Sequence, residues 1–227
     1  MISGSASVEF EAAGYVVIAN VLTEDEMRSA ARNLTESATQ AVGSRKLLER
    51  RWCQALARRL ADEPRLSAVM PAAARAVQCT LFEKKLDNNW LVALHQDLSI
   101  PVAERIENDR CTGWSHKEGV VFVQPPTAVL EELVIVRVHL DDCAERNGAL
   151  RVVPGSHRLG RLSPAQVSQV REARGESLVP VASGGAMLMR PLLLHASSKA
   201  SIDSPRRVLH FVFGPPTLPE GLRWPRA

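Results

Sequence analysis

The segment that decides the fold reads LVALHQDLSI and covers residues 91–100. It reads as an extended strand, in which side chains two residues apart point to the same face and lie about 7 Å apart. His95 and Asp97 therefore share one face of the predicted strand. Two side chains at this spacing are placed to bind one metal ion.

A series of short strand-like segments surrounds this one. Turn residues separate them, and they read as eight strands, at 78–83, 91–100, 119–123, 133–141, 149–153, 178–181, 186–194 and 206–213. Two long connections interrupt the series. The first, 101–117, is rich in charge. The second, 158–176, contains Ser163 and Pro164 in the order expected for the N-cap and first residue of an inserted helix.

The first third of the chain is predicted to be helical after a short strand at 15–19. Thr23 and Glu26 have the spacing of a capping box, and apolar residues recur at helical spacing beyond them. No repeat or flexible linker divides the chain, so we expect all 227 residues to form one domain. The expected fold class is mainly β with flanking α, a double-stranded β-helix (jelly-roll or cupin-like) barrel. Its helical front, about 20–77, would pack outside a barrel at about 78–214.

The third ligand is predicted to be His195, at the end of the seventh predicted strand. With His95 and Asp97 it would complete a two-histidine, one-carboxylate triad, which binds Fe(II) on one face and leaves positions open. A second His-x-Asp motif, His139 to Asp141, competes. In a double-stranded β-helix four strands separate the motif from the distal histidine. Four predicted strands lie between Asp97 and His195 but only two after Asp141, which favours the first motif.

A charged side chain in the last predicted strand indicates what kind of molecule could bind beside the metal. Arg206 is set to point inward in step with Val208 and His210, and a buried arginine needs a partner. Its planar guanidinium suits a carboxylate. A keto acid that chelates the iron through one end could meet Arg206 at its other end, and the Ser197 hydroxyl could add a hydrogen bond.

These motifs resemble the phytanoyl-CoA dioxygenase family of Fe(II)- and 2-oxoglutarate-dependent oxygenases. The resemblance rests on HQD at 95–97, on PGSH at 154–157 and on the stretch 195–206. It runs from the opening segment at 10–33 to near Phe213, which is most of the chain. It implies iron and 2-oxoglutarate as cofactor and co-substrate. The iron ligands it implies are His95, Asp97 and His195, and the residues around 2-oxoglutarate are Arg206, Ser197, Lys84, Asn89 and Trp90.

The activity that follows is hydroxylation of a small organic molecule by dioxygen, with decarboxylation of 2-oxoglutarate to succinate and CO2. Two alternatives stay open. One is a cupin-type metal enzyme that does not use 2-oxoglutarate, which would have no need for Arg206. The other is a non-catalytic barrel with a binding role.

Several further side chains keep two interpretations. Arg137 alternates inward and could meet either an anionic substrate or a partner in a core salt bridge. Structural roles are favoured for His139, His157 and His210. Trp114, His116 and Lys117 fall in the connection 101–117, which could form either a lid or a solvated loop.

Composition excludes several classes of protein. The net charge of +3 is too small and too scattered to predict nucleic-acid binding, and no apolar run reaches the ~18 to 20 residues that span a bilayer. The start of the chain lacks the features of a secretory signal, so we expect a cytoplasmic protein, monomeric or a small homo-oligomer. The four cysteines are widely spaced, which favours free thiols over disulfides or a zinc site.

Overall fold

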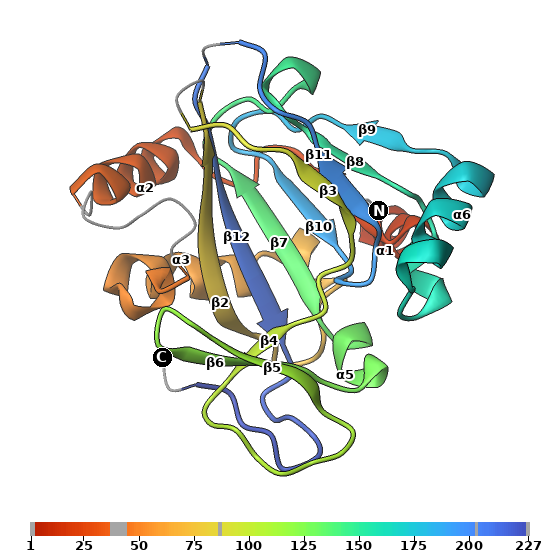
Figure 1. The fold of residues 1–227 in the computed structure, drawn as a ribbon. Coiled ribbons are helices and arrows are strands. Elements are labelled where there is room, and N and C mark those ends of the chain that lie inside the picture. Colours follow the sequence, from red (N-terminus) through yellow and green to blue (C-terminus); the bar gives the residue numbers. More distant parts are fainter. Residues whose placement is uncertain (1–2, 37–44, 86–87, 203, 226–227) are drawn as a thin grey trace.

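The computed structural model describes residues 3–36, 45–85, 88–202 and 204–225. Two β-sheets face each other, and a third, smaller sheet lies at one end of them (Figure 1). The sheets do not close into a continuous barrel, but the arrangement fits a jelly roll. The predicted fold class is confirmed. None of the described helices is long and apolar enough to cross a bilayer.

The larger sheet has five strands in the order β1-β10-β7-β12-β2, with antiparallel neighbours. Their bounds are β1 Tyr15–Ile18, β2 Arg75–Lys84, β7 Val134–His139, β10 Ala186–Met189 and β12 Arg206–Gly214. Strand β7 is buried along its whole length and alternates between two environments. Val134, Val136 and Val138 belong to the core between this sheet and the helices, whereas Arg137 lines a cavity on the opposite face.

The second sheet has four strands in the order β3-β11-β8-β9, and the third has the order β4-β6-β5. Their bounds are β3 Val92–His95, β4 Ile100–Val102, β5 Thr112–Lys117, β6 Val120–Gln124, β8 Leu150–Val152, β9 Ser177–Val179 and β11 His195–Ser197. The four-stranded sheet covers the inner face of the larger one, and the three-stranded sheet extends past its end (Figure 1).

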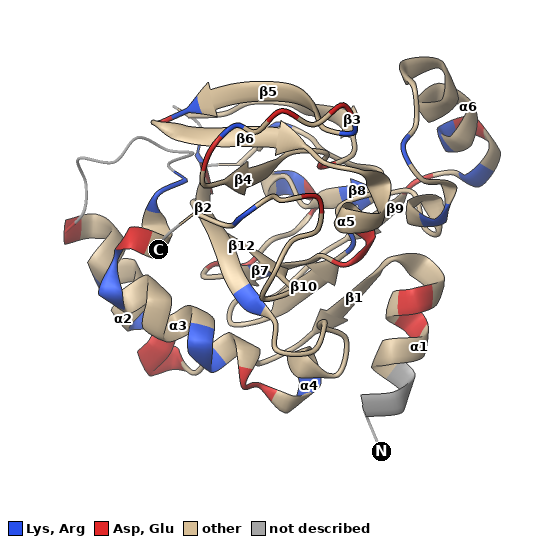
Figure 2. Cartoon of the chain, turned by 90° about the horizontal axis from the view of Figure 1, so that it is seen from below, with Lys and Arg blue, Asp and Glu red and all other residues tan. Residues whose placement is uncertain are grey.

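Helices lie outside the sheets. Their bounds are α1 Ser3–Ala13, α2 Glu24–Glu36, α3 Arg51–Ala61, α4 Pro64–Ser67, α5 Thr127–Glu131 and α6 Pro164–Arg174, with 3-10 turns at Leu47–Glu49, Glu145–Asn147 and Ser156–Leu159. Helices α1 to α4 lie along the outer side of the larger sheet (Figure 2). Leu60 and Phe10 are completely buried there, so the apolar faces of these helices form the core that supports the sheet.

Local signals for helix starts are confirmed. Thr23 accepts a hydrogen bond from the Glu26 amide at 3.2 Å, and Glu26 accepts one from the Thr23 amide at 2.8 Å, which is the predicted capping box. Ser163 caps α6 with Pro164 at its first position, as expected. Helix α1 was not predicted from the sequence.

Two predicted strands are wrong in their extent. The segment 91–100 forms two short strands, β3 and β4, with Asp97 in the irregular backbone between them. The segment 186–194 ends as a strand at Met189, and His195 begins a new strand. The segment 101–117 contains β5, so Trp114, His116 and Lys117 belong to a strand and not to a loop. The break after His95 allows Gln96 and Asp97 to turn toward different partners.

Candidate metal centre

The two candidate histidines come from neighbouring strands. His95 ends β3 and His195 begins β11, and these residues are paired across the antiparallel ladder. Their ring centroids lie 4.3 Å apart. Asp97 follows β3 by two residues, and its backbone amide donates to the Pro191 carbonyl at 2.9 Å. Strand pairing therefore brings together residues 100 positions apart in the chain.

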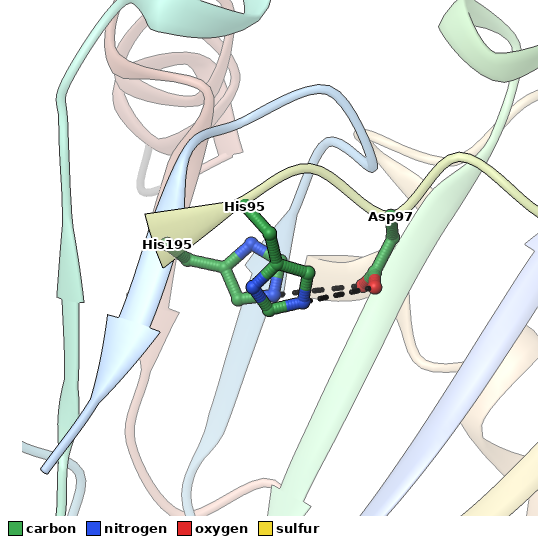
Figure 3. A group of neighbouring side chains, drawn as sticks. All are labelled: His95, Asp97 and His195. Atoms are coloured by element: carbon green, nitrogen blue, oxygen red, sulfur yellow. Dashed lines mark ion pairs between the residues drawn. The ribbon is translucent and has the colours of Figure 1, made fainter. Parts of the chain in front are cut away.

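The three side chains converge on one point (Figure 3). His95 Nε2 lies 3.6 Å from Asp97 Oδ1, and His195 Nε2 lies 3.7 Å from Asp97 Oδ2. One ligand atom from each residue lies within 4.8 Å of the other two. Within the described residues, this is the only such group of three or more histidine, cysteine or acidic side chains.

Hydrogen bonds fix the tautomer of both rings. His95 Nδ1 lies 2.8 Å from the Ala93 carbonyl oxygen, and His195 Nδ1 lies 2.9 Å from the Leu193 carbonyl oxygen. Because a carbonyl oxygen only accepts, Nδ1 carries the proton in each ring. The Nε2 lone pairs are then available at the centre, which is the usual arrangement of histidines that bind a metal.

The carboxylate has an unmet need that a cation would satisfy. Asp97 Oδ2 is buried and has no hydrogen-bond partner among the described residues. Burial acts to raise the pKa of Asp97, but the nearby His195 and His95 outweigh it and hold that pKa well below its ordinary value. Burial lowers the pKa of His195 to about 4. The site thus presents a carboxylate and a neutral imidazole from these two residues, and the donor set fits a divalent metal ion.

Gln96 holds the ligand segment in place. Its side-chain amide donates to the carbonyl oxygens of Gly160 at 2.8 Å and Leu192 at 2.7 Å, and its Oε1 accepts from the Leu162 amide at 2.9 Å. Sequence reasoning gave Gln96 no role. Its position between two candidate ligands was the available signal, because a residue adjacent to both can hold their segment in place.

A pair of buried cations lies on the inner face of the larger sheet. Lys84 and Arg206 are cross-strand partners, with 0% and 2% of their surfaces exposed. Lys84 Nζ donates to Ser197 Oγ at 2.8 Å and to the Ser198 carbonyl at 2.7 Å. Arg206 Nη1 donates to the Gly148 carbonyl at 3.1 Å.

No acidic side chain among the described residues forms an ion pair with either cation, and Arg206 Nε has no partner there. Burial, and secondarily the Arg206 charge, lower the pKa of Lys84 to about 8. Two buried positive groups without a counter-ion are costly, and a bound carboxylate would satisfy both.

One cavity of about 390 Å³ contains the triad and these cations. Its lining includes Lys84, Trp90, Ser197 and Arg206 beside the triad. Asn89 is not part of the lining. Its amide exchanges two hydrogen bonds with the Ala200 backbone, at 2.7 and 2.8 Å. The structure therefore gives Asn89 a role in holding the segment after β11, and its predicted contact with 2-oxoglutarate stays a prediction.

The competing motif has another role. Asp141 accepts hydrogen bonds from Arg207 Nε at 2.9 Å and from Arg207 Nη2 at 2.7 Å. His139 is 2% exposed, and neither ring nitrogen has a hydrogen-bond partner among the described residues. This carboxylate is already paired with Arg207, and neither His139 nor Asp141 lines the cavity. The structure therefore agrees with the preference for the first motif.

Comparisons with known proteins agree on the architecture. Residues 10–208 match the family described as phytanoyl-CoA dioxygenase (PhyH). None of the curated proteins compared with the chain matches it. Solved structures do, at identities low enough to establish only a common fold.

Three of these structures serve as examples. The alpha-ketoglutarate-dependent epimerase SnoN from nogalamycin biosynthesis aligns with a TM-score of 0.65 and 18% identity, over 93% of this chain and 81% of SnoN. The carbocyclase SnoK from the same biosynthesis gives 0.66 and 17%, over 96% and 88%. HygX from Streptomyces hygroscopicus, solved with nickel and 2-oxoglutarate bound, gives 0.62 and 20%, over 93% and 86%.

Proposed function

Since the chain belongs to the phytanoyl-CoA dioxygenase family of Fe(II)- and 2-oxoglutarate-dependent enzymes, we propose that it hydroxylates a small organic molecule. Dioxygen is the oxidant, and 2-oxoglutarate is decarboxylated to succinate and CO2. Iron bound with 2-oxoglutarate supplies this oxidative chemistry. The residues of the chain supply coordination, orientation and exclusion of water.

One observation carries the proposal. A single cavity holds a triad with the ligand atoms of a metal site and, beside it, a buried cation pair with no acidic partner among the described residues. A metal site alone would fit a cupin-type enzyme that does not use 2-oxoglutarate. Lys84 and Arg206 favour the 2-oxoglutarate enzyme because they match the free carboxylate of a chelating keto acid.

We assign His95, Asp97 and His195 to iron. The Ala93 and Leu193 carbonyls hold the two imidazole rings in the tautomer that presents Nε2 to the centre. Asp97 contributes the negative charge that offsets half the charge of a divalent ion. Retention of this carboxylate favours hydroxylation over halogenation, which needs its coordination position for a halide.

Arg206, Lys84 and Ser197 are assigned to the distal carboxylate of 2-oxoglutarate. Ser197 Oγ accepts a hydrogen bond from Lys84 Nζ at 2.8 Å, so the serine hydroxyl hydrogen is available to donate to a carboxylate. The guanidinium of Arg206 is held by the Gly148 carbonyl and keeps Nε unpaired. These three groups would fix one end of the co-substrate while its keto-acid end lies at the metal.

The proposal is tested by anaerobic titration with Fe(II) and then 2-oxoglutarate, followed by visible absorption. We expect a metal-to-ligand charge-transfer band that is lost in His195→Ala and requires much more 2-oxoglutarate in Arg206→Met. The matched control is Arg207→Gln, the neighbouring arginine that pairs with Asp141 outside the cavity. A wild-type protein without the band, or a band unaffected by His195→Ala, contradicts the proposal.

Hydroxylation is tested separately with candidate small molecules under labelled dioxygen. We expect one labelled oxygen atom in the product and one in the succinate. A product formed with succinate but without added oxygen, as in ring closure or epimerisation, would contradict hydroxylation while leaving the dependence on iron and 2-oxoglutarate intact.

A further inference from the structure

A third buried cation in the cavity has no role in the function proposed above. Arg137 is 5% exposed and lies on the inner face of β7. Its Nη1 lies 2.9 Å from His210 Nδ1, and its guanidinium lies 5.6 Å from the centre of the Phe82 ring. Its Nε has no hydrogen-bond partner and the side chain has no ion pair with an acid, within the part of the chain that the structure describes.

The register of the sheet separates Arg137 from the proposed 2-oxoglutarate site. Lys84 and Arg206 form one cross-strand row, whereas Arg137 and His210 form another with Thr80. The two rows lie four positions apart along β12, about 13 Å between their Cα atoms. The Arg206 charge still acts on Arg137, but the distal carboxylate of 2-oxoglutarate is already assigned to Lys84, Ser197 and Arg206, so we do not assign it to Arg137.

The charges of the cavity also leave Arg137 without a counter-ion. Asp97 is the only acidic side chain among the described lining residues. With a divalent metal bound, Asp97 and the metal-bound carboxylate of 2-oxoglutarate offset the metal charge. The distal carboxylate of 2-oxoglutarate belongs to Arg206 and Lys84. A positive charge at Arg137 then remains in a largely desolvated position, where an unpaired charge is unfavourable.

His210 adds a neutral hydrogen-bond donor at the same place. Because Arg137 donates to His210 Nδ1, the ring carries its proton on Nε2. Burial, and then the Arg137 charge, lower the pKa of His210 to about 3, so the ring is neutral at physiological pH. Burial, and then the Arg206 charge, lower the pKa of Arg137 to about 10, which leaves the guanidinium charged.

The cavity beyond Arg137 has an apolar wall. The next cross-strand row contains Gln78, Val212 and Ile135, and the lining continues through aliphatic and aromatic side chains, namely Ile100, Phe122, Leu130 and Leu133. A ligand there would bury an apolar body against this wall while an acidic group meets Arg137. A planar carboxylate matches the geometry of the guanidinium group, whose Nε has no hydrogen-bond partner among the described residues.

We propose that the substrate of this enzyme is a carboxylic acid with an apolar body, whose carboxylate binds Arg137 beside His210. This inference rests on the function proposed above, because it concerns the substrate side of the same metal centre. It makes Arg137 the residue that selects acids over neutral molecules of the same shape.

The test uses matched pairs of ligands that differ only in charge. Phenylacetate with phenylacetamide, and octanoate with octanamide, are titrated by calorimetry into protein loaded with Ni(II) and 2-oxoglutarate, which does not turn over. At least one acid should bind about tenfold or more tightly than its amide. In Arg137→Gln the preference should fall to about twofold or less, while 2-oxoglutarate affinity changes little. Arg207→Gln is the matched control and should keep the preference.

Arg137→Lys guards against loss of folding, since it keeps the charge and should keep part of the preference. The wild-type comparison decides even if both variants unfold, because the proposal is overturned if no acid binds more tightly than its amide. It is also overturned if Arg137→Gln keeps the preference, or if that variant weakens 2-oxoglutarate binding instead, which would assign Arg137 to the co-substrate. Failure of the wild-type protein to bind 2-oxoglutarate would contradict the proposed function. In that case the acid and amide pairs are titrated without 2-oxoglutarate, and they still test whether Arg137 selects carboxylic acids.

Discussion

Gln96, between the two ligands of the first motif, allows the sharpest test of how the fold holds the metal site. Replacement by leucine keeps a similar volume and removes three hydrogen bonds, to Gly160, Leu192 and Leu162. Each is worth about 1 kcal/mol net, so the variant should lose about 3 kcal/mol of unfolding free energy. The main-chain groups of Gly160, Leu192 and Leu162 would lose their partner at residue 96. The segment that carries the candidate ligands would then no longer be held in place.

The metal site should weaken together with the fold. Residues that orient ligands typically change metal affinity by about 10- to 100-fold when replaced. We therefore expect Gln96→Leu to bind Ni(II) at least about tenfold more weakly by calorimetry, even under conditions where circular dichroism shows a folded protein. Its unfolding free energy is measured by chemical denaturation of the metal-free protein.

A matched control separates orientation from general destabilisation. Gln54→Leu removes the single hydrogen bond that Gln54 donates to the Leu48 carbonyl, far from the site in α3. It should cost about 1 kcal/mol and leave metal affinity unchanged. The reasoning is refuted if Gln96→Leu loses stability but binds metal like wild type, or if Gln54→Leu weakens metal binding to the same extent.

Three further outcomes are expected. Because the pKa of Lys84 is about 8, its positive charge is present at pH 7 and is lost above pH 8. Calorimetry should therefore show that 2-oxoglutarate affinity falls about tenfold from pH 7 to pH 9. Lys84→Arg should abolish this pH dependence, and a steep fall in affinity in that variant would contradict the assignment of Lys84. Gly14 has φ +82°, and a Cβ there would lie 2.3 Å from the ring of His157, so Gly14→Ala should lose at least about 1 to 2 kcal/mol, read as a lower thermal midpoint; an unchanged midpoint would disagree. Adding metal at about 100 times its dissociation constant should stabilise the protein by about 2.7 kcal/mol and a chelator should reverse this, whereas His195→Ala should show neither effect.

The sequence alone predicted the three residues of the candidate metal site. His95, Asp97 and His195 were identified from the residue types and from the number of predicted strands between them, and the structure brings them together. The strand count itself did not hold, because seven strands, β4 to β10, lie between β3 and β11 and not four. The candidate ligands meet because β3 and β11 pair directly, with His95 opposite His195. The capping signals around α2 and α6 were equally readable, since they depend on residues three positions apart.

Other features required the tertiary structure. A continuous strand through Asp97 was predicted because periodicity cannot show where a ladder stops; the strand ends at His95, where the Gln96 side chain and the Asp97 amide bond to residues far along the chain. The sequence also gave no sign that the Asn89 amide bonds to the Ala200 backbone, because that partner lies 111 residues away.

Arg137 shows most clearly the difference between what the sequence predicts and what depends on the tertiary structure. The sequence indicated that its side chain points inward and left open a core salt bridge or an anionic substrate. Only packing reveals which charges surround a buried group, because the partners come from strands that are distant in sequence. The structure places His210 and Phe82 beside Arg137, with no acidic partner among the described residues. Residue order pointed to the candidate metal ligands, and three-dimensional contacts showed which buried charge has no acidic partner among the described residues.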